Sequence, residues 1–148
     1  MRLENFEIAS SIELQFEGQV WDLHNSAYFR GFQLSAADNT AVMDWSSLNS
    51  PSLPGRRGIR LRFNGLESVQ LTPRDGDLPL TEDTCVADIV KVDPAVQHAD
   101  PYIRAVLDYS DRFRLAFRFQ SGRIIEIGSE SVAFIVFSDE DFAERYQQ

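Results

Sequence analysis

Apolar and polar residues alternate with a period of two along much of the chain. Between Phe6 and Phe16 the even positions are mostly apolar and the odd positions mostly polar, as in a strand that buries one face. The segments 28–34 and 41–47 also have strand composition, and the polar stretch 35–40 between them is rich in turn residues. This arrangement predicts a β-hairpin.

The middle of the chain contains a second strong hairpin signal. Residues 59–63 alternate between apolar and basic side chains and are followed by Asn64-Gly65, a pair typical of tight turns. We therefore expect 66–71 to pair back onto 59–63. Residues 84–92 are β-branched and apolar enough for another strand, whereas 49–58 and 73–83 read as loops with proline and glycine.

The last third of the sequence specifies a register as well as strands. The apolar residues of 113–119 fall on alternate positions, and Gln120-Ser121-Gly122 suits a three-residue hairpin loop with Gly122 in the left-handed conformation. This loop sets Phe117 opposite Ile125 and Leu115 opposite Ile127, so that apolar side chains share one face; a shift of one residue would exchange the faces. Residues 128–131 are interpreted as a turn before a final strand at 132–137, and Ser138 as the N-cap of a short C-terminal helix.

Together these patterns predict an all-β fold, or a β-rich α+β fold. About nine or ten strands and one terminal helix fit an antiparallel sandwich or an open barrel, between which the patterning does not choose. The chain has 148 residues, and at this length we expect residues 1–148 to form a single domain.

The net charge of the chain bears on whether its partner is a nucleic acid or a protein. The chain has 14 Lys and Arg residues against 23 Asp and Glu residues, a formal net charge of −9. Such a chain repels phosphate backbones, so we expect no nucleic-acid partner. Acidity favours a basic protein partner, although it also serves solubility alone.

The chain shows no targeting signal, and its cysteine content suits a reducing compartment. Acidic residues interrupt the N-terminal stretch, and no apolar run approaches the ~20 residues of a membrane helix. We therefore expect no membrane association. Cys85 is the only cysteine, which excludes an internal disulfide and favours the cytoplasm.

Few residues suggest catalysis. Asp22 and His24 share a face of a predicted strand and could form a base and its orienting carboxylate, but a structural histidine is the commoner role for such a residue. Cys85 has no histidine nearby in the sequence and is interpreted as a buried structural thiol. We find no nucleophile elbow, nucleotide-binding loop or metal-ligand spacing, and predict no catalytic residue, no metal and no cofactor.

Arginines alternate along two of the predicted strands, as at Arg60 and Arg62, and at Arg114 and Arg118. Such rows could bind an anion, but outward-facing arginines neutralised by acids on neighbouring strands explain them more simply.

The candidate contact residues are aromatic and acidic. Trp21 and Tyr28 lie in or near the first predicted hairpin, and Tyr28 is followed by Phe29, which must point to the opposite face. Asp75, Asp77 and Asp83 belong to one acidic loop. The exposed edges of an unclosed sheet could also pair two copies of the chain into a homodimer.

Three segments resemble small bacterial β-rich domains of unknown function. They are 24–34 (HNSAYFRGFQL), 59–71 (IRLRFNGLESVQL) and 122–134 (GRIIEIGSESVAF), and the resemblance extends over about residues 20–137. Asn25 stands where those domains usually have an aspartate. Some of them are immunity proteins of toxin systems, and the resemblance implies a non-enzymatic role of that kind.

Three functions follow as hypotheses. The first is a non-enzymatic protein-binding domain, immunity-like or of another bacterial type, with an acidic, aromatic surface of Trp21, Tyr28, Asp75, Asp77 and Asp83 beside Asp22 and His24. The second is a carrier with an apolar ligand inside a β-barrel, suggested by the 11 phenylalanines. The third is a hydrolase or isomerase that uses His24 and Asp22.

Overall fold

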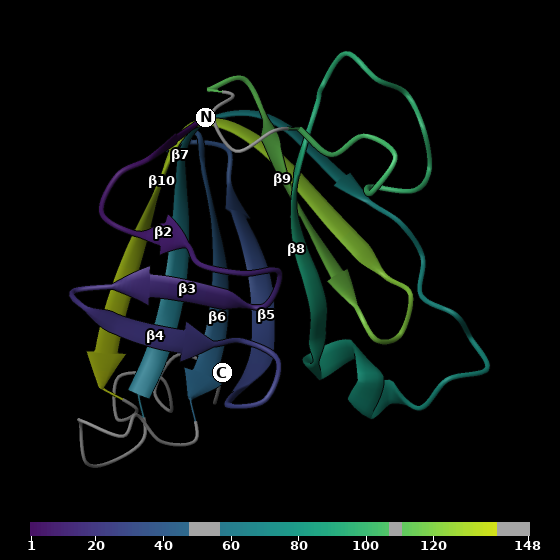
Figure 1. Cartoon of the computed structure of the whole chain (residues 1–148), viewed down its shortest axis with the longest axis horizontal. Coiled ribbons are helices and arrows are strands. Elements are labelled where there is room, and N and C mark those ends of the chain that lie inside the picture. Colours follow the sequence, from purple (N-terminus) through teal and green to yellow (C-terminus); the bar gives the residue numbers. More distant parts are fainter. Residues whose placement is uncertain (48–56, 107–110, 139–148) are drawn as a thin grey trace.

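The computed structural model describes residues 1–47, 57–106 and 111–138, which form an all-β fold (Figure 1). It contains a large, curled antiparallel sheet and a smaller three-stranded sheet. The strands are β1 (Arg2–Leu3), β2 (Glu7–Ile8), β3 (Glu13–Phe16), β4 (Gln19–Asp22), β5 (Ala27–Ser35), β6 (Thr40–Ser47), β7 (Arg57–Leu71), β8 (Val86–Val92), β9 (Arg114–Phe119) and β10 (Ile124–Ser138), and one 3-10 helix, η1, spans Leu80–Thr84. The predicted fold class is confirmed.

The large sheet has the strand order β5-β6-β7-β10-β9-β8, and β1 adds to β10 in parallel through Arg2 and Ser131. The small sheet β2-β3-β4 lies across the curled sheet in Figure 1, with its strands nearly perpendicular to β6 and β7. The curled sheet and this cover enclose the hydrophobic core, so each strand of the large sheet needs one apolar face.

The predicted hairpin at Asn64-Gly65 is wrong. The chain continues without reversal through β7, because β10 pairs with both halves of it: Val132 lies opposite Phe63, and Ile127 lies opposite Val69. Gly65 does adopt a left-handed φ of +63°, but it bends the strand instead of reversing it. The bend coincides with an irregularity of register between Gly128 and Ser129, as expected of a β-bulge.

The predicted turn at 128–131 is wrong for the same reason. β10 runs unbroken through this stretch, and both Ser129 and Ser131 are buried. The Ser129 hydroxyl donates a hydrogen bond to the Ser131 carbonyl at 3.0 Å. The buried serine hydroxyl is therefore satisfied within the bent part of β10. The predicted single strand from Phe6 to Phe16 is also divided, into β2 and β3, by a turn in which the N–H of Ala9 donates to the carbonyl of Glu13.

We expect Gly65→Ala to destabilise the protein by about 1–3 kcal/mol, because the position combines a positive φ with a close contact. An added Cβ would lie 2.6 Å from the side chain of Glu130. Urea denaturation measures the effect, with Gly76→Ala as the control because a Cβ at Gly76 meets nothing within 4 Å. Equal midpoints for the two variants would contradict the role of Gly65 in the bend.

Two hairpin predictions are confirmed. β5 and β6 pair as expected across the turn at 36–39. In the β9–β10 hairpin, Phe117 lies opposite Ile125 and Leu115 opposite Ile127, and Gly122 has a φ of +81°. The predicted strand at 84–92 corresponds to β8. The predicted helix after Ser138, which itself ends β10, and most of the predicted loop at 49–58 lie outside the described residues.

Aromatic rings fill the interior of the curled sheet. Phe117 contacts Trp45 and Phe63, with ring centroids 6.0 and 6.3 Å apart, and Phe29 contacts Trp45 and Phe119. These rings pack against one another where an apolar ligand would have to sit in the carrier hypothesis. Phe29 and its neighbour Tyr28 point to opposite faces as predicted, since Tyr28 is 44% exposed.

Candidate functional site

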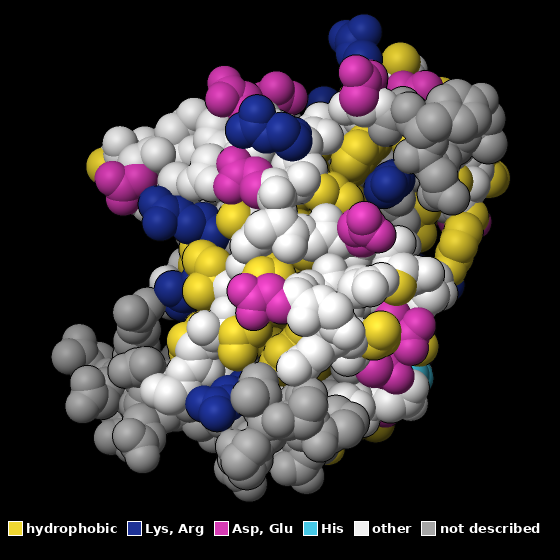
Figure 2. Space-filling model, turned by 60° about the vertical axis from the view of Figure 1, so that its left-hand side comes forward, with side chains coloured by type: hydrophobic (Ala, Val, Ile, Leu, Met, Phe, Trp, Pro, Cys, Tyr) yellow, Lys and Arg dark blue, Asp and Glu magenta, His cyan; other side chains and the backbone are white. Residues whose placement is uncertain are grey.

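Two of the alternating arginines, Arg60 and Arg118, pair with carboxylates on neighbouring strands. Arg60 on β7 donates two hydrogen bonds of 2.7 Å to Asp44 on β6, and Arg118 on β9 pairs with Asp88 on β8. Basic and acidic side chains are likewise interspersed on the face in Figure 2. Cross-strand neutralisation therefore explains Arg60 and Arg118, in line with the simpler interpretation of the sequence.

Asp22 and His24 do not form a catalytic pair. The Asp22 carboxylate accepts hydrogen bonds from the backbone N–H groups of His24 and Asn25 and from the Asn25 amide, at 2.7–2.9 Å. Burial raises the pKa of Asp22, but these bonds outweigh burial and lower it overall. Asp22 is thus an ionised residue that shapes the 22–25 turn, and its bonds go to the backbone and Asn25, not to the His24 ring.

The structure brings Cys85 beside His24, which the sequence did not suggest. The Cys85 sulfur lies 3.4 Å from His24 Nδ1, and the same nitrogen lies 2.8 Å from the Val86 carbonyl oxygen. A carbonyl only accepts, so Nδ1 must carry the ring proton and cannot withdraw one from the thiol. Burial, followed by the charges of Glu82 and Asp22, raises the pKa of Cys85, so the thiol is not activated.

Six of the seven candidate contact residues lie on elements that meet at one end of the molecule. The N–H of Asp75 donates to the Ser121 carbonyl, and the N–H of Ser121 donates to Glu82 in η1. η1 leads directly into Cys85, which contacts His24, and η1 also lies against β5. We call this region the acidic end; its residues are Asp22, His24, Tyr28, Asp75, Asp77, Glu82 and Asp83.

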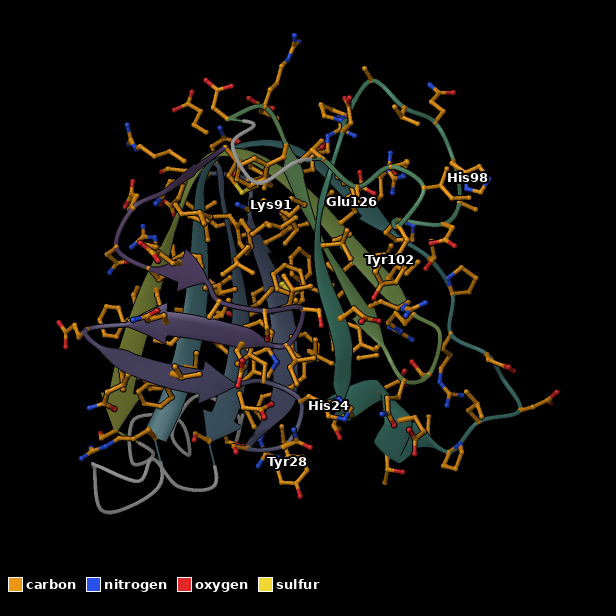
Figure 3. All side chains as sticks on the ribbon, in the orientation of Figure 1. His24, Tyr28, Lys91, His98, Tyr102 and Glu126 are labelled. Atoms are coloured by element: carbon orange, nitrogen blue, oxygen red, sulfur yellow. The ribbon has the colours of Figure 1, made fainter. Side chains whose placement is uncertain are left out.

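The seventh candidate, Trp21, is not a contact residue. It is 5% exposed and packs against Phe134 in the core, with ring centroids 5.8 Å apart. The prediction failed because alternation places Trp21 on the inward face of β4, and the large sheet covers that face through Phe134 of β10. In Figure 3, His24 and Tyr28 lie close together at the lower end of the ribbon.

Charges at the acidic end are only partly compensated. Asp83 pairs with Arg74 at 2.9 Å and lies 3.7 Å from Arg123. Asp75, Asp77 and Glu82 have no basic partner among the described residues. η1, which contains Glu82, lies against β5, an edge strand of the large sheet. Within residues 1–47, 57–106 and 111–138, no backbone group outside β6 pairs with β5.

A second region, which the sequence did not indicate, lies on the outer face of β9 and β10. There the segment 93–106 crosses the sheet and forms a cleft of about 460 Å³. Glu126 is 3% exposed, and both its oxygens accept hydrogen bonds from Arg104, which is 8% exposed. Arg114 also donates to Glu126, at 3.5 Å. Burial raises the pKa of Glu126, but the two arginines outweigh it and lower the pKa overall.

The crossing segment is held by further contacts. The Arg118 guanidinium lies 5.0 Å from the ring centroid of Tyr102, and the N–H of Val106 donates to the Lys91 carbonyl. Figure 3 shows Tyr102 and His98 on this segment and Glu126 and Lys91 on the sheet beneath it. The segment therefore covers what would otherwise be the solvent face of the sheet.

The chain matches no known family model, no curated protein and no solved structure. The resemblance to immunity proteins therefore stays a prediction. Among the described residues, no three His, Cys, Asp or Glu side chains are grouped so as to hold a metal ion. No helix in the same residues has the length and apolarity needed to cross a membrane.

Proposed function

We propose that this chain is a non-enzymatic protein-binding domain whose acidic end docks onto a basic surface of a partner protein. The observation that carries the proposal is the set of carboxylates Asp75, Asp77 and Glu82, which have no basic partner among the described residues. They lie in and before η1, which packs against β5, the strand that carries the exposed Tyr28. Excess negative charge would steer the encounter with a basic partner, and an exposed tyrosine on the adjoining strand would supply contact area.

The edge strand β5 supports the same role. An edge with unpaired backbone groups can accept an extended segment of another protein. In the immunity-like form of the proposal, the acidic end would cover a basic active site of a toxin in the cytoplasm. A toxin gene beside the gene for this chain would support that form. A second copy of the chain is the competing occupant of the edge, and sedimentation of the purified protein distinguishes the two.

The two other hypotheses have less support. Aromatic rings pack in the interior where an apolar ligand would lie. The Asp22 carboxylate accepts hydrogen bonds from the 24–25 backbone and the Asn25 amide, and His24 Nδ1 donates to the Val86 carbonyl. Asp22 therefore does not orient the His24 ring as a base.

The proposal predicts that a triple variant, Asp75→Asn/Asp77→Asn/Glu82→Gln, binds its partner about tenfold more weakly. Three lost surface attractions of about 0.5 kcal/mol each give this factor. The partner is captured at low salt from cells that encode the chain, identified, purified and titrated by calorimetry. Binding to the original chain should also weaken as salt is raised.

The matched control is Glu7→Gln/Glu17→Gln/Glu67→Gln, which removes three exposed carboxylates outside the acidic end. Both triple variants remove three negative charges, so an effect of net charge alone would weaken partner binding by the same factor in each. The proposal is abandoned if the control weakens binding as much as the triple variant, or if low-salt capture recovers no partner that binds the purified chain.

A further inference from the structure

The cleft above Glu126 is built from a sheet and a crossing segment, and its floor is charged. β10 contributes Glu126 and Ile124, β9 contributes Arg114, and the segment contributes Arg104, Val96 and His98. A volume of about 460 Å³ is in the range of pockets that hold small molecules.

The charges in the cleft do not balance. Among the described residues that line it, Glu126 is the only acid, while Arg104 and Arg114 are both permanently charged. One carboxylate thus serves two guanidinium groups and leaves one positive charge in excess. Asp83 also lies near two arginines, Arg74 and Arg123, but those arginines stand beside further carboxylates at the acidic end, whereas no other acid lines this cleft among the described residues.

Glu126 positions Arg114 but accepts a hydrogen bond from only one nitrogen of the Arg114 guanidinium. Arg104 occupies both Glu126 oxygens, and Arg114 donates through one Nη atom alone. A guanidinium has five N–H donors, and within the described residues Glu126 is the only partner of Arg114. The remaining N–H groups are those a ligand can reach, since the Arg114 side chain is 25% exposed.

His98 adds a hydrogen-bond donor to the lining of the cleft, and three apolar residues form another part of that lining. His98 Nδ1 accepts the N–H of Asp100 at 3.0 Å, so the neutral ring carries its proton on Nε2 and can donate from there. Val96, Pro94 and Ile124 line the cleft with apolar surface. The cleft therefore offers donors for an anionic group and a surface for an apolar part.

From this geometry we propose that the cleft binds a small organic anion. Its carboxylate or phosphate group pairs with Arg114, and its apolar part lies against Val96 and Ile124. The anion supplies the negative charge that the cluster lacks, and the forked guanidinium suits either group. This site is separate from the acidic end and does not depend on the protein-binding proposal.

Benzoate, succinate and inorganic phosphate serve as probes, and neutral benzamide as the uncharged counterpart of benzoate. The purified full chain is titrated with each probe and followed by NMR through backbone amides and arginine Nε–H signals. At least one organic anion should give saturable shifts at Val96, His98 and Arg114, with a dissociation constant of about 1 mM or below. Arg114→Gln should weaken its binding at least about tenfold.

Arg62→Gln, an exposed arginine of β7 outside the cleft, is the control and should bind as the original chain does. If Arg114→Gln unfolds, Arg114→Lys replaces it, and the loss of the fork should still weaken binding about threefold. Four results would each overturn the proposal: no saturable probe, equal shifts with benzamide and benzoate, unchanged binding in the Arg114 variant, or binding of phosphate alone.

Discussion

Glu126→Ala is expected to lower the free energy of unfolding by about 3–5 kcal/mol, the cost of leaving a buried charge without its partner. Within the described part of the chain, Glu126 is the only carboxylate paired with Arg104, whose side chain is 9% exposed. Without Glu126 the guanidinium stays under the crossing segment with nothing to compensate it. Urea denaturation measures the loss, and Glu67→Ala on the exposed face of β7 should change stability by no more than about 0.5 kcal/mol.

A double-mutant cycle measures the interaction energy between Arg104 and Glu126 separately from the effect of each side chain alone. Arg104→Ala should cost less than Glu126→Ala, because Arg114 still donates to the buried Glu126 when Arg104 is removed. The double variant should cost clearly less than the sum, since no isolated charge remains. Additive losses would show that the two side chains act through unrelated contacts, against the bidentate geometry.

The same pair predicts a pH dependence with a definite sign. The pKa of Glu126 is lowered below its ordinary value of 4.5 in the folded chain, so folding favours the ionised form. The resulting stability is fully present above pH 4.5 and is lost as the pH falls through the lowered pKa. The gap in stability between the original chain and Glu126→Gln should therefore shrink as the pH falls below about 4.5. A gap that stays constant into strong acid would contradict this assignment.

The local patterns of the sequence were sufficient for strands and for one register. In the β9–β10 hairpin, alternation and the position of Gly122 fixed the partners of Phe117 and Leu115, because any shift would have buried charge. The same reasoning failed at Gly65, where a turn-forming pair lies inside a long strand. Whether Asn64-Gly65 reverses the chain depends on β10, whose Ser131 pairs with Asn64 from 131 − 64 = 67 residues further along the chain. Such a distant partner leaves no local trace in the sequence.

Of the two candidate sites, the sequence identified residues of the acidic end but not the cleft at Glu126. Composition identified Asp75, Asp77 and Tyr28 as surface residues, but contacts across the fold, through Ser121 and η1, are needed to link them. Glu126 could not be recognised, because an acid in the sequence IIEI reads as an ordinary outward residue. It is buried only because the segment 93–106 folds over β10. The sequence feature that could have indicated a buried acid is Arg104, the one charged residue between Tyr102 and Val106.

Phe117→Ala is expected to destabilise the protein by about 3–5 kcal/mol, because it removes a ring at the centre of the core. Phe117 is fully buried and its ring meets those of Trp45 and Phe63, so the cavity has walls from β6, β7 and β9 that cannot close together. The adjacent Arg118→Ala on the opposite face loses a partly exposed ion pair with Asp88, whose side chain is 14% exposed, and should cost about 1 kcal/mol. If chemical denaturation gave the larger loss to Arg118→Ala, the faces of β9 would be exchanged, and with them the register on which the core and the cleft depend.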